Sequence, residues 1–272
     1  MQLQANQEHS TTAPMLVTGG TGTLGRHLVP RLLEAGCRVR VLTRTSREPV
    51  EGVEFVTGDL ATGEGIEAAV EGMETVVHCA GSGKGDDEKA RNLVRAASGA
   101  NIQHLVYISV VGADRTPIAS GVDRAMFGYV GAKRAAELII ADSGVPYTTL
   151  RATQFHDLVL MMAQGMANLP VIPVPAGFSV QPIDASEVAA RLAELALGEP
   201  AGLVPEMGGP QVHSLAELIR GYLRATGRRR LITPVRMPGG AASAFRNGAN
   251  LALGQAVGRR TWDDFLADRV DV

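Results

Sequence analysis

Tyr129 and Lys133 stand four residues apart in the sequence, within the segment YVGAK. In a helix this spacing places both side chains on one face, one turn apart. A neighbouring ammonium favours the phenolate, so we expect Lys133 to lower the pKa of Tyr129 from its usual value of about 10. Such a phenol can exchange a proton with a carbonyl or an alcohol oxygen. The same pair also occurs on solvated helix faces, so its meaning depends on its surroundings.

A glycine-rich segment much earlier in the chain has the spacing of a dinucleotide-binding loop. Residues 19–25 have the sequence GGTGTLG, with glycines at the first, fourth and seventh places. Such glycines allow a tight turn, the close approach of a diphosphate and the close packing of the next helix. The unpaired N–H groups at the start of that helix favour phosphate. We expect the cofactor to contact five residues of this loop: Gly19, Thr21, Gly22, Thr23 and Leu24.

The flanking sequence separates this loop from other glycine-rich loops. An apolar run, Met15–Thr18, precedes it and an amphipathic segment follows, as in a strand–turn–helix unit. A nucleoside-triphosphate loop requires Lys and Ser or Thr where this chain has Arg26 and His27. The segment therefore indicates a dinucleotide rather than a nucleoside triphosphate.

The end of the second β-rich run indicates which dinucleotide is bound. Arg44 lies there, about 20 residues after the glycine turn, where NAD-binding proteins usually carry Asp or Glu. A guanidinium donates paired, charge-assisted hydrogen bonds to a 2′-phosphate. No carboxylate follows the run before Glu48. We therefore expect NADP(H) as the cofactor.

Residues after the third and fourth runs complete the expected cofactor site. The Asp59 carboxylate, next to Leu60, is placed to accept from an adenine amino group or to cap the helix that follows. Ala80 and Gly81 follow the fourth run, and their small size lets a ribose and diphosphate lie against the backbone. His78, just before them, is expected to be a packed residue and not a catalytic one.

Strands and helices alternate along the chain, as in a parallel sheet covered by helices. The expected strands are near-continuous apolar runs at 15–18, 38–43, 53–57, 74–79, 104–110 and 146–151. The expected helices lie at 23–35, 64–71, 87–99, 122–143, 184–197 and 214–226. Prolines make the pattern irregular after about residue 153. The predicted fold class is therefore α/β, a Rossmann doubly wound parallel sheet with a small, irregular carboxyl-terminal substrate-binding part.

The pattern divides the chain into three parts. Residues 1–13 are expected to be a flexible extension, residues 14–153 an NADP-binding Rossmann core, and residues 154–272 a substrate-cleft region partly interleaved with the core. With 272 residues, 45% of them hydrophobic and 20% charged, the chain can bury a sizeable core.

Charge and cysteine content limit the partners that we expect. The net charge of −2 gives no general reason to expect nucleic acid or a membrane surface as partner. There is no apolar run long enough to span a bilayer and no apolar signal core at the start. Cys37 and Cys79 are expected to be reduced core thiols, and the cysteines and histidines have no metal-ligand spacing. We expect a cytoplasmic monomer or homodimer that acts on a small molecule and binds no metal.

These segments together resemble the short-chain dehydrogenase/reductase superfamily, specifically its atypical, NmrA-like branch. The resemblance spans about residues 14–200 and implies a Rossmann core with NADP at the glycine turn. It implies that Arg44 contacts the 2′-phosphate and that Asp59 and Leu60 contact the adenine. The segments that carry it are TGGTGTLG at 18–25, GDL at 58–60, YISVVG at 107–112, YVGAK at 129–133, PYTTLR at 146–151, and QPID at 181–184 with EVA at 187–189.

The resemblance also implies a catalytic arrangement. Tyr129 would exchange the proton, while Lys133 would lower its pKa and hold the nicotinamide ribose. In active members a Ser or Thr after the fifth strand helps to polarise the carbonyl. Here the strand ends at Ser109, followed by Val110 and Val111, so either Ser109 or a valine without a donor occupies that place.

Three functions fit this sequence. We expect an NADP(H)-dependent reductase that transfers hydride to a small, apolar carbonyl or related substrate. One alternative is a non-catalytic, NADP-binding sensor or regulatory protein, as found in the NmrA-like branch. The other is a nucleotide-sugar epimerase or dehydratase, for whose second diphosphate the chain offers only the basic triplet Arg228–Arg230. The expected cleft residues form an apolar and flexible set: Phe155, His156, Met161, Met162, Met166 and Phe178.

Overall fold

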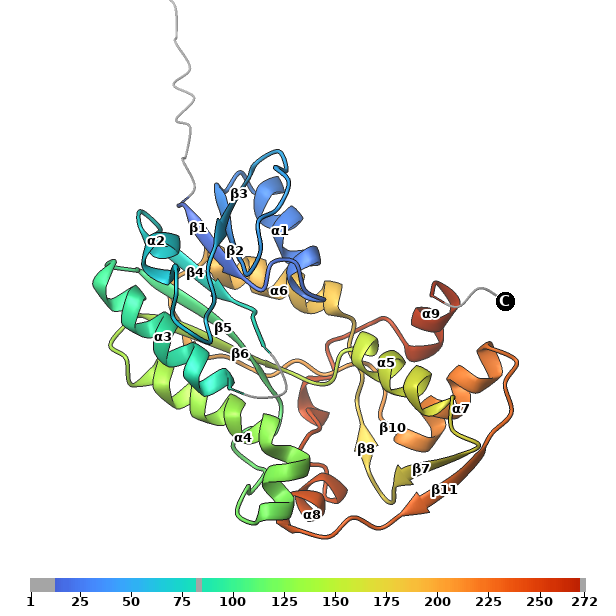
Figure 1. The fold of residues 1–272 in the computed structure, drawn as a ribbon. Coiled ribbons are helices and arrows are strands. Elements are labelled where there is room, and N and C mark those ends of the chain that lie inside the picture. Colours follow the sequence, from blue (N-terminus) through green and yellow to red (C-terminus); the bar gives the residue numbers. More distant parts are fainter. Residues whose placement is uncertain (1–12, 82–84, 270–272) are drawn as a thin grey trace, which may run out of the picture.

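The computed structural model describes residues 13–81 and 85–269. Across these residues the centre of the fold is a parallel sheet of seven strands (Figure 1). The strand order is β3-β2-β1-β4-β5-β6-β9, and the first six strands follow the order of a Rossmann sheet. This arrangement confirms the predicted fold class. The strands are β1 (Met15–Thr18), β2 (Val39–Thr43), β3 (Val53–Thr57), β4 (Thr75–His78), β5 (His104–Val110), β6 (Tyr147–Ala152) and β9 (Gly202–Leu203).

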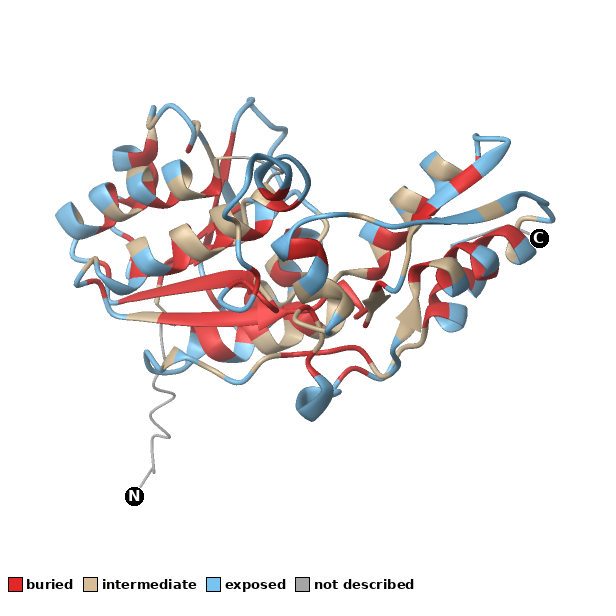
Figure 2. Ribbon diagram, turned by 90° about the horizontal axis from the view of Figure 1, so that it is seen from below, coloured by how far each residue is buried: buried red, intermediate tan, exposed pale blue. Residues whose placement is uncertain are grey.

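Helices cover both faces of this sheet. Helices α1 (Gly25–Glu34) and α6 (Ala185–Leu197) pack on one face. Helices α2 (Ile66–Val70), α3 (Asp86–Gly99) and α4 (Gly121–Ala141) pack on the other. Alternate residues of each strand enter the two layers, so that Val17 packs towards α1 and Leu16 towards α2 and α3. The buried strands in Figure 2 explain why the sequence shows near-continuous apolar runs.

The order of the strands reverses between β1 and β4, which are neighbours in the sheet. The connections from these two strands leave towards opposite faces, and a crevice opens at their carboxyl ends. In an open α/β sheet this crevice is where ligands bind. The glycine turn follows β1, and Ala80 and Gly81 follow β4, so both predicted segments lie at this point.

A smaller lobe lies beyond the carboxyl ends of the strands (Figure 1). Its core forms where α5 (His156–Met166), α7 (Leu215–Ala225) and α9 (Trp262–Ala267) pack around residues such as Leu218 and Phe265. Helix α6 and strand β9 come from the same half of the chain but join the large sheet layer. The elements of the lobe are α5 (His156–Met166), β7 (Val171–Pro175), β8 (Ser179–Val180), β10 (His213–Ser214), α7 (Leu215–Ala225), β11 (Leu231–Val235), α8 (Gly240–Arg246), the 3-10 turn η1 (Leu253–Gln255) and α9 (Trp262–Ala267).

The six expected strands and six expected helices all form, with ends shifted by at most two residues. Helix α1 begins at Gly25 rather than at residue 23, because the preceding residues are used by the turn. The strands β7 and β11 were not predicted, since Pro173, Pro175 and Pro234 interrupt them. Proline lacks an N–H donor and is tolerated here because the two strands form an isolated pair with open edges. Among the described residues, no helix is both long and apolar enough to cross a membrane.

Candidate active site

The glycine turn is shaped by backbone contacts that a side chain would prevent. Gly19 has a φ of +71°, and a Cβ there would lie 2.6 Å from the Ala80 nitrogen. A Cβ on Gly25 would lie 2.3 Å from the Gly19 carbonyl oxygen, so this glycine lets the helix start directly against the loop. A Cβ on Gly22 would meet only the Gly19 oxygen, at 3.3 Å, and the residue lines the cleft. Gly22 is thus the position where a ligand can approach the backbone.

The N-terminus of α1 faces this turn. No side chain among the described residues caps it, and Leu24 occupies the cap position. The Arg26 and His27 N–H groups donate to the Gly22 and Leu24 carbonyls, both at 3.0 Å, so the start of α1 favours a phosphate mainly through the positive end of the helix dipole. Thr21 and Thr23 line the same part of the cleft. An open cradle with an uncapped helix start fits the diphosphate of a dinucleotide.

Thr18 and His78 tie the ends of β1 and β4 together below the cradle. The Thr18 Oγ1 and His78 Nδ1 atoms are 2.7 Å apart, and both residues are fully buried. The His78 ring stacks on Tyr107, with ring centroids 5.3 Å apart. Burial lowers the pKa of His78 to about 3, so the imidazole is neutral at ordinary pH. As expected from the sequence, His78 is a packed residue.

The predicted adenine end of the site contains two arginines and a carboxylate that is already hydrogen-bonded within the protein. Arg44 and Arg47 line the cleft beyond the end of β2, and Arg44 is exposed. Asp59 also lines the cleft, but its Oδ1 accepts a hydrogen bond from the Ala61 N–H at 2.8 Å. Asp59 therefore stabilises a turn, whereas the cap position of the next helix is held by Gly65. Leu60 is buried beside it and also reaches the cleft.

Helix α4 brings Tyr129 and Lys133 to the cleft from the opposite side. The Lys133 ammonium is buried, donates to the Ile108 carbonyl at 3.1 Å and lies 3.2 Å from Asp86 Oδ2. It lies 5.8 Å from the centroid of the Tyr129 ring. A Cβ on Gly81 would lie only 3.2 Å from this ammonium, so the small residue after β4 also makes room for the lysine.

The expected lowering of the Tyr129 pKa is wrong. Burial of the phenol and the Asp86 carboxylate both raise the pKa of Tyr129. The charge of Lys133 cannot offset this, because Asp86 forms an ion pair with the ammonium. Burial also lowers the pKa of Lys133, against the opposing effect of Asp86. Tyr129 keeps 36% of its surface exposed and is a protonated phenol that can donate towards the cleft.

Ser109 lines the cleft, but its hydroxyl oxygen is buried, which argues against the predicted contact with a substrate. The residue is 2% exposed and its Oγ atom has essentially no accessible surface. Its side chain lies on the α4 side of β5, near Glu137, whose carboxylate forms two 2.8 Å hydrogen bonds with the Arg151 guanidinium. Arg151 also lies 2.8 Å from Asp114. This buried network fixes α4 against β6 and so positions the helix that carries Tyr129.

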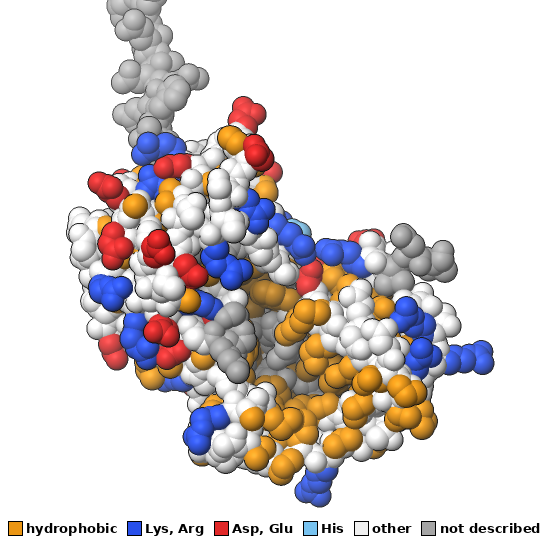
Figure 3. Space-filling model, in the orientation of Figure 1, with side chains coloured by type: hydrophobic (Ala, Val, Ile, Leu, Met, Phe, Trp, Pro, Cys, Tyr) orange, Lys and Arg blue, Asp and Glu red, His pale blue; other side chains and the backbone are white. Residues whose placement is uncertain are grey.

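The cleft between the two lobes has a volume of about 1490 Å³. Its polar end holds the glycine turn and the catalytic candidates. Figure 3 shows the hollow, with hydrophobic side chains gathered around its other end. The apolar lining there includes Phe155, Met161, Met162 and Phe178 from the expected set, together with Met126, Phe127, Leu158, Met237 and Phe245.

Two of the expected cleft residues are core residues instead. His156 is buried against Trp262 and Phe265, with ring centroids 5.9 and 5.0 Å apart, and burial lowers its pKa to about 4. Met166 packs in the same core. The triplet Arg228–Arg230 lies outside the described lining of the cleft, whose cations are Arg44, Arg47, Lys89 and Lys133. The cleft thus gives no support for a second diphosphate at its apolar end.

Two groups of site residues were missed from the sequence. Asp86 resembles any acidic residue in the first turn of a helix, where it suits the helix dipole. Only the packing reveals that it is 1% exposed and paired with Lys133. Phe245 and Met237 come from segments far along the chain that show no periodic pattern, so no local signal places them in the cleft.

The comparison with protein families agrees with this geometry. The family model described as NAD(P)H-binding matches residues 19–194, which is more than half of the chain. The chain therefore belongs to the NAD(P)H-binding family of Rossmann-fold proteins.

Individual relatives within this group differ in role. A (4-alkanoyl-5-oxo-2,5-dihydrofuran-3-yl)methyl phosphate reductase of Streptomyces griseus is 29% identical, over 79% of this chain and 74% of the relative. The photosystem II assembly factor Ycf39 of Trieres chinensis is 28% identical, over 64% of this chain and 57% of the relative. The NADPH-dependent quinone oxidoreductase of Escherichia coli, solved with NADPH, is 20% identical, with a TM-score of 0.73 over 93% of this chain and 99% of the other. The last likeness concerns the fold.

Proposed function

We propose that this protein is an NADP(H)-dependent reductase of a small, apolar carbonyl compound. The observation that carries the proposal is that one cleft joins three parts: the glycine cradle, the Tyr129–Lys133 pair and an apolar pocket. A bound NADPH supplies hydride, the two electrons and one hydrogen that reduce the carbonyl carbon. The proton that the carbonyl oxygen needs to become a hydroxyl group comes from the protein.

Tyr129 is the proposed proton donor. Because burial and Asp86 raise its pKa, the phenol is protonated at neutral pH and its O–H can donate to the carbonyl oxygen. As the oxygen gains negative charge, the proton moves to it, and the Tyr129 phenolate takes a proton back from water in the open cleft. The Lys133 ammonium, which is fixed by Asp86 and the Ile108 carbonyl, is proposed to hold the nicotinamide ribose next to Tyr129.

The cofactor site is proposed to prefer NADP(H) over NAD(H). Gly19, Thr21, Gly22, Thr23 and Leu24 hold the diphosphate through the loop and the start of α1. In the proposed complex Arg44 contacts the 2′-phosphate, Asp59 and Leu60 lie at the adenine, and Ala80 and Gly81 border the ribose. Arg44 and Arg47 supply two cations at the end of β2, and the lining has no carboxylate between them.

The lining of the cleft supports an apolar substrate. Four methionines and four phenylalanines line the cleft that also contains Tyr129. Methionine adapts to irregular shapes, so this pocket suits a family of flexible or aromatic carbonyl compounds. Ser109 is absent from the proposed catalytic group because its hydroxyl is buried.

The test combines binding and turnover. The protein and its Tyr129→Phe variant are titrated with NADPH and NADH, and NADPH oxidation is then followed with a panel of aldehydes, ketones and quinones. Tyr147→Phe, which changes a tyrosine outside the described cleft lining, is the matched control. We expect NADPH binding in all three proteins and carbonyl-dependent oxidation in all but Tyr129→Phe.

A non-catalytic NADP-binding protein is the second candidate, because the Ser109 hydroxyl is buried and Val110 and Val111 line the cleft beside it. A valine offers no donor to a developing oxyanion. The similarity to Ycf39 also favours this candidate. If no carbonyl compound oxidises NADPH and Tyr129→Phe binds NADPH as the native protein does, this candidate replaces the reductase.

A further inference from the structure

The small parallel pair β7–β11 has one face in the core and one face open to solvent. In a parallel ladder, residues that are paired in register point to the same side. Val171 pairs with Leu231, Pro173 with Thr233 and Pro175 with Val235. Ile172 and Val174, which alternate with them, are buried among α5, α7 and α9. The residues Val171, Pro173, Leu231, Thr233 and Val235 therefore form an outward surface, here named the β7–β11 face.

The β7–β11 face is apolar and well exposed. Val171, Leu231 and Val235 retain 43%, 66% and 44% of their surface. A single exposed aliphatic residue needs no explanation, but several on one sheet face form a patch of the kind that binds a partner. The patch belongs to the part of the molecule where Figure 3 shows hydrophobic side chains around the hollow.

The surroundings of this face are strongly basic. Three arginines, Arg229, Arg230 and Arg236, adjoin β11 in the sequence, and no Asp or Glu lies between residues 218 and 262. Arg229 and Arg230 directly precede Leu231, and Arg236 directly follows Val235, so cations border both ends of the face. Within the described part of the chain, no carboxylate forms an ion pair with any of these three arginines.

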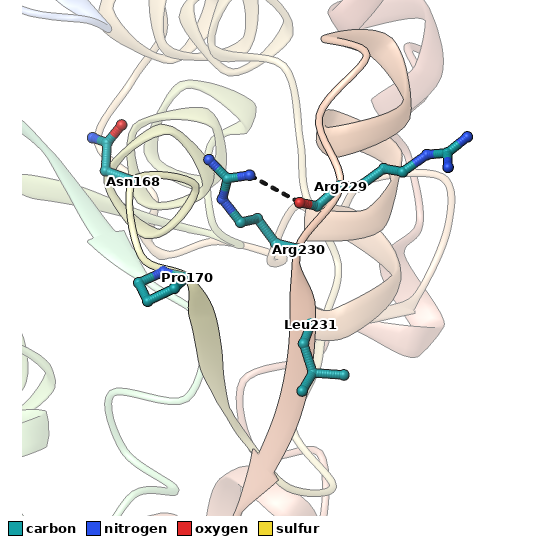
Figure 4. A pocket seen from close by; sticks show the side chains of 5 residues that line it. All are labelled: Asn168, Pro170, Arg229, Arg230 and Leu231. Atoms are coloured by element: carbon teal, nitrogen blue, oxygen red, sulfur yellow. Dashed lines mark hydrogen bonds between the residues drawn. The ribbon is translucent and has the colours of Figure 1, made fainter.

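Figure 4 shows the basic end of the face at close range. The Arg230 guanidinium lies beside Asn168 and donates to the Arg229 carbonyl at 2.9 Å, while the Leu231 side chain points outwards. Together with Pro170, these residues line a shallow pocket apart from the cleft. A single partner could therefore be attracted by the arginines and could bury the apolar side chains of the face at the same time.

We propose that the β7–β11 face docks on the surface of an anionic lipid bilayer. An amphipathic surface binds such a bilayer by burying aliphatic side chains at the headgroup boundary and by attracting anionic lipids with arginine. Two copies of the chain joined by this face would bring arginines against arginines. Nucleic acid is also a poor match, because the face has no aromatic side chain on which bases could stack.

The net charge of −2 and the absence of membrane spans led us to expect no membrane partner. The arrangement of the charges changes that expectation for a peripheral contact. Attraction to a surface falls off within a Debye length, roughly 8 Å at physiological ionic strength, so the charges that act on a bound bilayer are those directly at the face, where Arg229, Arg230 and Arg236 adjoin β11. The acidic side chains visible in Figure 3 lie mostly over the Rossmann lobe.

Docking in this way would place the cleft beside the bilayer. Pro175, at the end of β7, and Met237, just after β11, both line the cleft. An apolar compound dissolved in the membrane then has a short path to the pocket. The docking itself does not depend on the proposed reductase function.

The test is co-sedimentation of the full chain with vesicles of phosphatidylcholine, alone or with about one third phosphatidylglycerol. We expect binding to the anionic vesicles, little binding to the neutral ones, and loss of binding at high salt. The variant Arg229→Gln/Arg236→Gln should weaken the partition coefficient by about 30-fold, because each arginine near an anionic surface contributes about 1 kcal/mol to binding. Leu231→Ser, at an exposed site, should weaken it further without changing the melting temperature.

The matched control is Arg38→Gln/Arg95→Gln, which removes two exposed arginines of the Rossmann lobe and should leave binding unchanged. The proposal is overturned if the native protein ignores anionic vesicles, or if both double variants bind equally well. It is also overturned if sedimentation of the protein alone shows a dimer that Leu231→Ser dissociates, since the face would then bind a second copy.

Discussion

Alanine at Gly25 and alanine at Gly22 are expected to have different consequences, although the two positions are three residues apart in one loop. At Gly25 the new Cβ would lie 2.3 Å from the Gly19 oxygen and 2.4 Å from the Gly20 Cα. These are backbone atoms, so the loop or α1 has to move by about 1 Å, and overpacking of this kind costs roughly 1–3 kcal/mol. At Gly22 the single close contact is 3.3 Å and φ is not positive, so we expect a cost of about 0.5 kcal/mol or less.

Both variants are expected to bind NADPH poorly, for different reasons. Gly25→Ala displaces the start of α1, whereas Gly22→Ala places a methyl group where the diphosphate approaches. A loss of about 1.4 kcal/mol or more in binding corresponds to at least a tenfold weaker Kd. Fluorescence titration with NADPH measures this loss. Thermal unfolding measures the stability, with an expected fall of about 2–4 °C per kcal/mol for Gly25→Ala alone.

Either half of this expectation can fail on its own. If Gly22→Ala stays folded and binds NADPH within about twofold of the native protein, the loop does not hold the diphosphate. If Gly25→Ala is as stable as Gly22→Ala, the close contact between α1 and Gly19 does not exist as described.

Three further outcomes follow from the site. Arg44→Gln should weaken NADPH binding by about tenfold or more, because charge-assisted hydrogen bonds to the 2′-phosphate are lost. NADH binding should stay unchanged, and an equal loss for both cofactors would contradict the role of Arg44. Asp86→Asn removes a charge that raises the pKa of Tyr129, so the alkaline limb of the pH profile for kcat should move to lower pH. If the limb does not move, either Tyr129 is not the proton donor or Asp86 does not control its pKa. His78, with a folded-state pKa of about 3 against an unfolded value of 6.5, contributes stability that is present above pH 6.5 and is lost as the pH falls towards 3. At about pH 5 that loss is roughly 2 kcal/mol, so urea denaturation of His78→Asn should show a weaker dependence on pH than the native protein, and an equal dependence would refute the assignment.

The sheet was predictable because its strands are buried on both faces. Residues 105–111 form a near-continuous apolar stretch interrupted by Ser109, and such a stretch between turn signals leaves few alternatives. The glycine loop was predictable because its requirements are local. At Gly19 and Gly25 nearby backbone atoms leave no room for a Cβ, so the spacing of the glycines in the sequence is enough to identify the loop.

The chemistry of the pair on α4 was only partly predictable. The spacing of Tyr129 and Lys133 correctly puts both residues at the cleft. The direction of the Tyr129 pKa was wrong because it depends on Asp86, which comes from another helix and neutralises the lysine. A pairwise argument along one helix cannot include a third charge that arrives through tertiary packing.

The apolar end of the cleft was the least predictable part. Phe178 and Met161 were expected there, but His156 and Met166 lie in the core of the small lobe. Along α5, residues a few positions apart face either the cleft or α9, and the orientation of a helix between two apolar surfaces leaves no clear periodic signal. Phe245 lines the cleft only because α8, which lies late in the sequence, packs against this part of the fold.

The central claim is that the bound cofactor is used, with Tyr129 as proton donor. The most direct measurement is the single-turnover rate at which enzyme-bound NADPH is oxidised by a ketone or aldehyde, for the native protein and for Tyr129→Phe. Loss of a general acid typically slows such a step by about 10²–10⁴-fold, and we predict a loss in this range with NADPH affinity retained. Equal rates in the two proteins, with equal NADPH affinity, would contradict the account.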